Sequence, residues 1–327
     1  MKYYLAPLEG VTNYIYRNAY HEHFSPLDKY FTPFISTNQN NSFSTRDLKE
    51  LNLDHNAGLP VIPQILSNKS DEFIKTAKAI AAYGYDEINL NLGCPSNTVV
   101  AKNKGSGFLF HPDLLDAFLY DIFSQSTTKL SVKTRLGKYD PDEFYKLVTI
   151  FNKYPMEELI IHPRIQKDMY RNTPNLHVFK EALVELKPPV CYNGDIFTRD
   201  DYDHIHALFP TVDKIMLGRG IIGNPALIGQ IKYSQNTNLT TLRHFHDTLY
   251  DAYRGILHGD HNVLHKMKEL WFYMIHIFSD SKKYAKRIKK CDHLSDYNHI
   301  VDALFAEQTL LENPSGYRCI VEGASFG

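Results

Sequence analysis

The chain has 327 residues, and its 36 lysine and arginine side chains against 37 aspartate and glutamate side chains give a net charge of −1 at pH 7. This balance excludes a protein whose whole surface is positively charged for nucleic acid, so any RNA contact must come from a local patch or from shape. Hydrophobic residues make up 43% of the chain, and this length and composition are typical of one large globular domain with a smaller one.

Short apolar runs recur through the first two thirds of the chain. They lie at residues 3–7, 29–32, 61–66, 87–92, 130–135, 158–162, 190–193 and 214–218. Several are apolar at almost every position, which is typical of strands buried on both faces of a parallel sheet. We therefore predict a parallel strand at each run.

The segments between these runs carry helix-start residues. Asp140-Pro141-Asp142-Glu143 combines an N-cap residue, a proline at the first helical position and a glutamate that can close a capping box. Thr173-Pro174 and Asn224-Pro225 repeat the cap and the proline, and Thr198-Arg199-Asp200-Asp201 predicts another capping box. Residues 71–83 place apolar side chains at helical spacing. This alternation predicts an α/β fold, a closed (β/α)8 TIM barrel, with an open doubly wound sheet as the alternative.

The pattern changes after a polar stretch at residues 234–238, which looks like a linker. Helical periodicity then continues without strand runs at residues 242–257, 263–278, 281–290 and 295–311. The sequence therefore predicts a barrel domain over residues 1–235 and a small C-terminal all-helical domain over residues 240–327.

The four cysteines, Cys94, Cys191, Cys291 and Cys319, are far apart and form no CxxC pair, so we expect neither a disulfide framework nor a zinc site. The N-terminal run is broken early by Pro7, which argues against a signal peptide. No run approaches the roughly 18 apolar residues that a membrane span needs. We therefore expect no membrane span and a reducing, cytoplasmic setting.

Polar or reactive side chains follow nearly every predicted strand. In a β/α barrel the reacting groups lie at the carboxyl ends of the strands, because the loops there vary over a rigid base. A barrel without a ligand site would not need this clustering, so the sequence predicts an active site at that face. The residues concerned are Glu9, Gln64, Asn91, Cys94, Lys133, Arg135, His162, Arg164, Asn193, Gly194, Asp195, Gly218 and Arg219.

The last two predicted strands end in glycine-rich turns, Asn193-Gly194-Asp195 and Gly218-Arg219-Gly220. The phosphate group of a barrel ligand commonly lies there, held by backbone N–H groups, and an arginine adds a charged fork. The pattern GxGxxG, which starts at Gly218, also fits a dinucleotide site, but it follows the last strand rather than the first. We therefore predict a mononucleotide phosphate site.

Lys133, within the fifth predicted strand, would be costly to bury without a negative partner. The N1–C2=O edge of a reduced flavin is such a partner, and an ion pair with Glu9 or Asp195 is the alternative. His162, at the end of the next strand, is predicted to contact the same ligand. Gln64 either reads the edge of a flavin or base, or bridges two strand ends.

Cys94 lies in the run Asn91-Leu92-Gly93-Cys94-Pro95, just after a strand end. Its loop continues to Lys104-Gly105-Ser106-Gly107, which we expect to be flexible enough to move over a ligand. A cysteine thiol titrates at about pH 8.5, so it is protonated at rest, which suits a general acid opposite a hydride donor. A nucleophilic role lacks an adjacent base in the sequence. Cys191, inside a strand, is expected in the core.

The helical tail contains six basic residues within nine positions, with no acid among them. They are Lys282, Lys283, Lys286, Arg287, Lys289 and Lys290. At helical spacing Lys282, Lys283, Lys286, Arg287 and Lys290 fall largely on one face. This predicts a stripe that binds RNA phosphates, with a merely solvated helix face as the alternative. Trp271 is expected in the core rather than as a platform for bases.

Taken in order, these motifs resemble the dihydrouridine synthases, flavin enzymes that act on tRNA. The resemblance rests on Ala6-Pro7-Leu8-Glu9-Gly10-Val11-Thr12, the Cys94 run, Val132-Lys133-Thr134-Arg135, His162-Pro163-Arg164, Asn193-Gly194-Asp195-Ile196 and Gly218-Arg219-Gly220. The helical tail is similar to the small RNA-binding domain that this family carries. Asp168 stands where the family usually has a glutamine.

The resemblance implies FMN on the barrel face and NADPH as the reductant. The residues that it assigns to FMN are Pro7, Leu8 and Glu9 through their backbone, Gln64 and Lys133 at the polar edge of the ring, and His162, Asn193, Gly194, Asp195, Gly218 and Arg219 at the phosphate end. Hydride would pass to C6 of an extruded uracil, and Cys94 would protonate C5. The residues expected to bind the RNA are Asn91, which orients the base, and Arg135, Arg164, Lys282, Lys283, Lys286, Arg287 and Lys290. No metal and no protein partner are implied.

Two other functions remain compatible with the sequence. An FMN-dependent dehydrogenase of a free pyrimidine, of the dihydroorotate or dihydropyrimidine type, would share the flavin site and the cysteine, but it needs neither a helical tail nor a basic stripe. A non-catalytic RNA-binding protein that keeps the barrel as a scaffold would bind no flavin. The sequence leaves open which uridine is reduced, whether the RNA is tRNA or rRNA, and whether NADPH or NADH is preferred.

Overall fold

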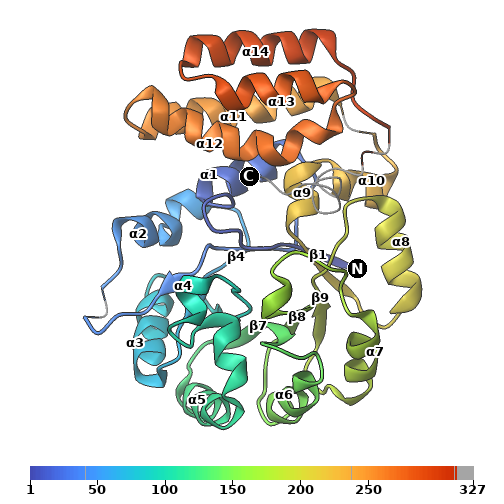
Figure 1. Ribbon diagram of the computed structural model, residues 1–327. Helices are drawn as coiled ribbons and strands as arrows, with labels where there is room; N and C mark the ends of the chain where they lie inside the picture. Colours follow the sequence, from blue (N-terminus) through green and yellow to red (C-terminus); the bar gives the residue numbers. More distant parts are fainter. Residues whose placement is uncertain (41, 237, 313, 315–327) are drawn as a thin grey trace. The chain divides into compact units, whose positions relative to one another are not determined.

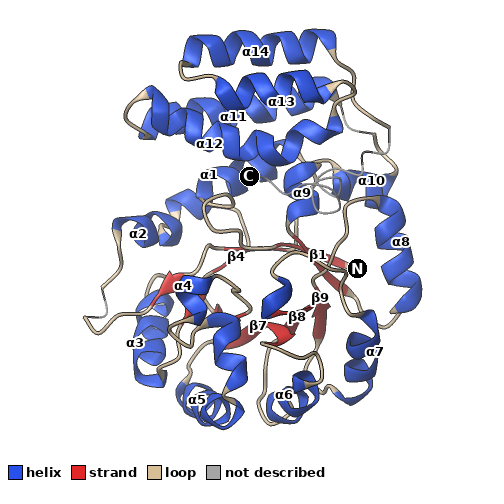
Figure 2. Ribbon diagram, in the orientation of Figure 1, coloured by secondary structure: helices blue, strands red, loops and turns tan. Residues whose placement is uncertain are grey.

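The computed structural model describes residues 1–40, 42–236, 238–312 and 314. Within these ranges ten strands form one parallel sheet in the order β3-β5-β6-β7-β8-β9-β10-β1-β2-β4 (Figures 1 and 2). The strands are β1 (Lys2–Leu5), β2 (Lys29–Phe31), β3 (Ile35–Ser36), β4 (Val61–Ile62), β5 (Gln64–Leu66), β6 (Glu87–Leu92), β7 (Lys129–Gly137), β8 (Leu159–Ile165), β9 (Val190–Tyr192) and β10 (Lys214–Leu217). Every predicted run overlaps at least one of these strands, whereas β3 lies outside the predicted runs.

The last strand of this order, β4, is connected through Pro63 to β5, which pairs with the first strand, β3. β2 pairs with β4 and β3 pairs with β5, and Pro63 alone separates β4 from β5. Proline has no N–H to donate to a neighbouring strand, but the Pro63 carbonyl still accepts the N–H of Asn89 at 2.9 Å. β4 and β5 are therefore one interrupted strand. The sheet closes on itself as the predicted TIM barrel, and the open doubly wound sheet is excluded.

Helices cover the outside of the strands, where Figure 1 shows α3, α5, α6 and α7. The helices of this part are α2 (Thr45–Leu51), α3 (Ser70–Ala81), α4 (Asn97–Val100), α5 (Pro112–Gln125), α6 (Glu143–Phe151) and α7 (Leu176–Glu185). α3 buries Phe73, Ile74, Ala77 and Ile80, the apolar face that helical spacing predicts.

Helix starts depart from the prediction where a turn intervenes. α6 begins at Glu143 rather than directly after Asp140, although the Glu143 carboxylate still accepts the Asp140 backbone N–H at 3.1 Å. α7 is capped by Asn175, whose side chain accepts the N–H of Val178 at 3.1 Å, and not by the predicted Thr173. Proline favours the first helical turn without fixing which residue begins it.

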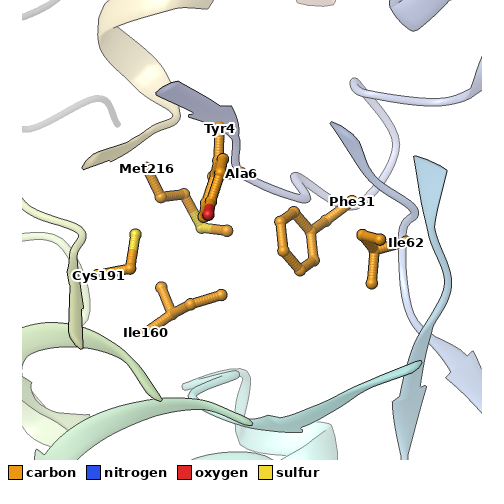
Figure 3. Packing of buried hydrophobic residues seen from close by; sticks show 7 residues of the cluster. All are labelled: Tyr4, Ala6, Phe31, Ile62, Ile160, Cys191 and Met216. Carbon is orange, nitrogen blue, oxygen red and sulfur yellow. The ribbon is translucent and has the colours of Figure 1, made fainter. Parts of the chain in front are cut away.

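An apolar layer fills the interior of the barrel. The side chains shown in Figure 3 point into it from six strands or their ends, and they are Tyr4, Ala6, Phe31, Ile62, Ile160, Cys191 and Met216. Cys191 is fully buried, which confirms its predicted place in the core. Because this layer is closed, a ligand can enter the barrel only from the ends of the strands.

The chain packs as two compact units. The first consists of Met1–Glu9, Asp28–Gly194 and Phe209–Met216, and the second of Gly10–Leu27, Asp195–Leu208 and Leu217–Gly327. The helices of the second unit are α1 (Tyr14–His23), α8 (Arg199–Leu208), α9 (Arg219–Gly223), α10 (Leu227–Tyr233), α11 (Leu239–Ile256), α12 (Asp260–Met274), α13 (Ser281–Lys290) and α14 (Leu294–Glu307). The four helices predicted in the tail correspond to α11 to α14, and the predicted domain boundary at residues 235–240 stays a prediction.

The core of the second unit is aromatic. In α12, Trp271 is 2% exposed and donates its indole N–H to the Tyr297 hydroxyl of α14 at 2.7 Å, which confirms its predicted core position. α1 joins this unit through α11, where the rings of Tyr16 and Phe245 meet edge to face at 5.7 Å. Among the described helices of the chain, none combines the length and apolar character that crossing a membrane requires.

Candidate active site

The loop that carries Cys94 is shaped by the side chain of Asn91, near the carboxyl end of β6. The Asn91 side-chain oxygen accepts the backbone N–H of Gly93 at 3.0 Å and that of Cys94 at 2.9 Å. These two donors identify the oxygen of the amide, so the Asn91 nitrogen points away from the loop and donates to Gln64 Oε1 at 2.7 Å. The turn that presents the thiol therefore depends on one buried amide.

A second segment holds the same loop through the Cys94 carbonyl. This oxygen accepts the Ser106 hydroxyl at 2.8 Å and the Ser106 N–H at 3.1 Å. Gly105 has φ +56°, and a Cβ there would lie 2.7 Å from the Cys94 carbonyl oxygen, so glycine is required. Gly105–Phe110 forms a short 3-10 helix whose first five residues are buried. The structure thus differs from the predicted flexible segment, because these glycines permit close packing rather than motion.

The Cys94 thiol is half-buried. Burial raises its pKa above the ordinary value, although the Ser96 backbone N–H and the charges of Arg135 and Lys133 oppose the shift. A thiol with a raised pKa stays protonated at neutral pH and has a proton to give. In the described ranges, no group of three His, Cys, Asp or Glu side chains is placed to hold a metal beside it or elsewhere.

Gln64 belongs to a chain of buried amides and a hydroxyl that crosses three strands. Its Nε2 donates to Asn89 Oδ1 at 2.7 Å, and Asn89 Nδ2 donates to Ser131 Oγ at 2.9 Å. The parallel register sets Asn89 beside Gln64 and Ser131, so these side chains share the interior face of the barrel. The structure thus shows that Gln64 bridges β5 and β6, and that the nitrogen and the oxygen of its amide each keep one further hydrogen-bonding position.

Lys133 also faces the barrel interior, because β7 pairs it with Asn91 of β6 and Ile160 of β8. Its ammonium makes no hydrogen bond and no ion pair to any residue in the described part of the chain. Burial lowers the pKa of Lys133 to about 8, and repulsion from Arg135 adds to the shift. A ligand with a negative charge or an exposed carbonyl would satisfy this side chain.

The two acids considered as partners for Lys133 are engaged elsewhere. Glu9, exposed after β1, pairs with Arg46 of α2. Asp195 pairs with Arg219 at 2.7 Å within the second unit. The alternative in which Lys133 forms an ion pair with either acid is therefore wrong. Next to Glu9, Pro7 and Leu8 are half-buried, and Leu8 packs against the apolar layer of the barrel.

Arg135 is buried and holds two loops together. Its guanidinium donates to the carbonyls of Gly93 at 3.0 Å, Ile165 at 2.9 Å and Met169 at 2.6 Å. With 1% of its surface exposed, the side chain positions the Cys94 loop against the loop that follows β8. Its predicted contact with RNA stays a prediction, and the structure gives it a positioning role.

His162 and Arg164 lie two residues apart in β8 and touch each other. Arg164 Nη1 is 3.0 Å from His162 Nε2. A guanidinium only donates hydrogen bonds, so His162 Nε2 accepts and the ring proton resides on Nδ1. Arg164 also donates to the carbonyls of Arg171 and Asn172 and is 1% exposed, which makes it a second anchor of the same loop.

The predicted phosphate-binding residues follow β9 and β10, in two segments. In the first unit, Asn193 Nδ2 donates to the Met216 carbonyl at 2.9 Å. A Cβ at Gly194 would lie 2.0 Å from the Tyr192 hydroxyl, so the strand can end here only in glycine. In the second unit, Gly218 precedes α9, and the Arg219 guanidinium is held by its ion pair with Asp195.

The six basic residues of α13 are all exposed, and Tyr284 and Ile288 are the buried residues of this helix. At about 100° per residue, the basic side chains occupy one arc and the buried pair lies opposite. Lys289, which was not among the residues predicted to share this face, falls within the same arc. Lys286, Arg287 and Lys290 line a groove of about 440 Å³ with residues of α14.

Asn89 and Ser131 belong to the site but were not predicted from the sequence, although one sequence pattern indicates them. In the run 87–92, asparagine occupies alternate positions of an otherwise apolar strand, so Asn89 and Asn91 share a face. The same period of two places Ser131 on the face of Lys133. Polar residues at alternating positions of a buried strand therefore mark the interior of this barrel.

The chain is similar to known proteins over most of its length. Residues 4–313 match the family model described as dihydrouridine synthase (Dus). A "probable tRNA-dihydrouridine synthase" of Staphylococcus aureus (strain Mu50 / ATCC 700699) is 30% identical over 260 residues, which cover 76% of this chain and 77% of that protein. The "tRNA-dihydrouridine synthase B" of Pasteurella multocida (strain Pm70) is 29% identical over 226 residues, 68% of this chain and 67% of that one.

A solved structure of an old yellow enzyme homologue from Zymomonas mobilis is similar with a TM-score of 0.52. It covers 75% of this chain and 92% of its own, at 12% sequence identity. At that identity the likeness concerns the fold alone.

Proposed function

The chain belongs to the dihydrouridine synthase family, and from this premise we propose that it is an FMN-dependent tRNA-dihydrouridine synthase with NADPH as its reductant. It would reduce the C5=C6 bond of uridine. The observation within the molecule that carries the proposal is the half-buried thiol of Cys94, just after β6, together with Lys133 of the adjoining β7, whose ammonium has no partner in the described residues.

The residues around Lys133 suit FMN. The Lys133 ammonium has no negatively charged partner in the described residues. The N1–C2=O edge of a reduced flavin carries a negative charge and would be such a partner. Gln64 keeps one donor and one acceptor position for the same polar edge. The half-buried backbone of Pro7 and Leu8, with Glu9, would lie against the ring.

We assign the phosphate end of FMN to the strand ends of β8, β9 and β10. Glycine allows close approach of backbone N–H groups to a phosphate, and an arginine adds positive charge. The Nδ1–H of His162, inferred from its contact with Arg164, is a further donor of the right kind. The assigned residues are His162, Asn193, Gly194, Asp195, Gly218 and Arg219.

The reduction needs one hydride and one proton. Reduced FMN, held by the residues assigned above, would supply the hydride to C6 of the uracil. Cys94 supplies the proton to C5 from the opposite face, which leaves a thiolate that takes a proton back from water. Asn91 keeps the thiol in place, because its side-chain oxygen accepts the Cys94 N–H at 2.9 Å. The electron pair of the hydride comes in turn from NADPH.

An RNA substrate requires two further features of the protein. The target base must leave its stack, because C5 and C6 cannot meet a cofactor inside a helix. The phosphate backbone must also be held, and the exposed basic arc of α13 is suited to this. We assign that contact to Lys282, Lys283, Lys286, Arg287 and Lys290. A tRNA substrate agrees with the expected cytoplasmic location.

The second candidate function is reduction of a free pyrimidine. It would use the same thiol and lysine, but it gives the basic arc of α13 no role. Equal rates on free uracil or orotate and on tRNA would favour it. A purified protein that binds no flavin would favour the non-catalytic alternative instead.

Mass-resolved nucleoside analysis of tRNA from cells that lack this chain tests the proposal. We expect dihydrouridine to disappear at defined positions and to return when the wild-type chain is supplied. Unchanged dihydrouridine at every position would exclude the chain as a tRNA-dihydrouridine synthase in those cells.

A further inference from the structure

A patch of aromatic and lysine side chains, of which three are exposed and Lys138 is half-buried, lies outside the residues assigned above. It consists of Phe110, Lys138, Tyr139 and Lys167, and we call it the aromatic–lysine patch. Phe110 is 48% exposed and Tyr139 is 44% exposed, so two large rings adjoin at the surface. The four residues follow β6, β7 and β8, three neighbouring strands of the barrel in the first unit.

The patch is ordered by contacts among its own members. The rings of Phe110 and Tyr139 meet edge to face with centroids 4.9 Å apart. Lys138 Nζ lies 5.2 Å from the Phe110 centroid and 4.8 Å from that of Tyr139. Lys167 Nζ lies 4.7 Å from the Tyr139 centroid. Both ammonium groups therefore rest on ring faces, and neither forms an ion pair in the described residues.

Nearby acids form no ion pairs with these lysines in the described residues, and their carboxylates accept backbone N–H groups instead. Glu143 accepts the N–H groups of Lys138 at 2.8 Å and Tyr139 at 3.0 Å. Asp168 accepts the Ile165 N–H at 3.0 Å. The patch therefore presents two ammonium groups without an ion-pair partner in the described residues beside two aromatic rings.

The base under the patch is rigid and joined to the Cys94 loop. Gln166, next to Lys167, donates its side-chain N–H to the Pro95 carbonyl at 3.1 Å. Met169 has φ +52° and ψ −100°, a strained conformation for a residue with a side chain, and Arg135 fixes it through the Met169 carbonyl. Strain that the surroundings hold in place is typical of functional segments. A ring on a rigid base loses little entropy when it binds.

We propose that the aromatic–lysine patch is a second RNA contact, in which the rings stack on unpaired bases beside the target uridine and the lysines bind their phosphates. Stacking tolerates any base, and ammonium groups exchange a ring face for a phosphate. Extrusion of one base leaves its neighbours unstacked, so a platform beside the site replaces the stacking that they lose. This inference rests on the proposed function, because it takes the substrate to be RNA.

The test compares single variants of the full, FMN-loaded chain. Tyr139→Ala and Lys167→Gln change the patch, and Tyr139→Phe keeps the ring. Tyr120→Ala is the control, because it removes a more exposed tyrosine of α5, at 67% exposure, outside the patch. The probe is an unmodified tRNA transcript, labelled for binding by fluorescence anisotropy and unlabelled for kinetics. Unfolding curves establish that each variant folds as the wild type does.

We expect Tyr139→Ala to weaken binding and raise KM roughly tenfold with kcat within about twofold, and Tyr139→Phe to restore both. Lys167→Gln should lower the slope of log Kd against log salt concentration by about one. Binding by the patch variants equal to that of Tyr120→Ala would overturn the proposal. If the wild type binds the transcript through the patch but forms no dihydrouridine, the proposed function fails and the RNA contact stands.

Discussion

The side-chain oxygen of Asn91 lies 2.9 Å from the backbone nitrogen of Cys94 and accepts its hydrogen bond. The same amide donates to Gln64 at 2.7 Å, so one side chain connects the proposed proton donor with the residue assigned to the flavin edge. Asn91 is 7% exposed, and its hydrogen bonds have little competition from water.

Two replacements of Asn91 distinguish its contact with the Cys94 loop from its contact with Gln64. Asn91→Asp keeps an acceptor for the Gly93 and Cys94 N–H groups but removes the donor to Gln64, whereas Asn91→Ala removes both. We expect Asn91→Ala to lower the rate of uridine reduction more than Asn91→Asp, and to reduce stability by about 1–3 kcal/mol because two backbone N–H groups lose their partner. Single-turnover rates and urea unfolding measure both effects. Equal rates for the two variants would show that the loop does not depend on this amide.

Lys133 is predicted to lower the stability of the folded protein and to be required for cofactor binding. Its pKa falls from the ordinary 10.5 to about 8, which corresponds to a cost of roughly 3 kcal/mol for the charged form in the folded protein. Lys133→Met should therefore raise the unfolding free energy of the FMN-free protein by about 1–3 kcal/mol at pH 7 and abolish tight FMN binding.

The stability difference between Lys133→Met and the wild type should decrease as pH rises. Between pH 8 and pH 10.5 the unfolded lysine keeps a proton that the folded one has released, so the wild type gains stability as pH rises through this window. The variant lacks this gain, and the difference between the two proteins should shrink. Urea unfolding at both ends of the window measures it. A variant that is less stable at pH 7 and still binds FMN would contradict the role given to Lys133.

The positions of the strands, and with them of Cys94 and Lys133, follow from the sequence because buried parallel strands are continuously apolar. The partners of Arg135 do not, since they are carbonyls from two loops that meet only in the folded barrel. The role of Gly105 does not follow from the sequence either. Its residue type suggested a flexible loop, whereas its φ of +56° allows close packing against Cys94. Local pattern therefore predicts which strand carries a residue, and tertiary contact decides what that residue does.

The rate of uridine reduction should fall as pH rises through the raised pKa of Cys94. A general acid must be protonated to act, and burial holds this thiol protonated beyond its ordinary range. Single-turnover rates with pre-reduced enzyme between about pH 6 and pH 10 should be flat at the acidic end and decline at the alkaline end. A rate that instead increases with pH would indicate a thiolate mechanism.

His246 should make the second unit sensitive to acid. Its Nδ1 lies 2.8 Å from Asp247 and its Nε2 lies 2.6 Å from the Tyr297 hydroxyl, which also accepts the indole N–H of Trp271. The Asp247 carboxylate only accepts, so the ring proton of neutral His246 resides on Nδ1 and the Tyr297 hydroxyl donates to the unprotonated Nε2. Burial lowers the pKa of His246 below its ordinary value of 6.5.

The sign follows from proton linkage. As pH falls below 6.5, the unfolded histidine takes up a proton before the folded one does, so the unfolding free energy decreases. Trp271 is the one tryptophan of the sequence, and its fluorescence reports this unit during urea unfolding. His246→Gln should be less stable at neutral pH and lose most of this acid dependence. An unchanged dependence would assign the effect to other groups.

The central claim is that Cys94 gives the proton to C5 of uridine. Its most direct test measures dihydrouridine by mass-resolved nucleoside analysis after FMN-loaded wild type and Cys94→Ala react with NADPH and an unmodified tRNA transcript. We predict that both proteins are yellow and oxidise NADPH, while Cys94→Ala forms dihydrouridine at least about a hundredfold more slowly. Equal rates of dihydrouridine formation by the two proteins would contradict the account.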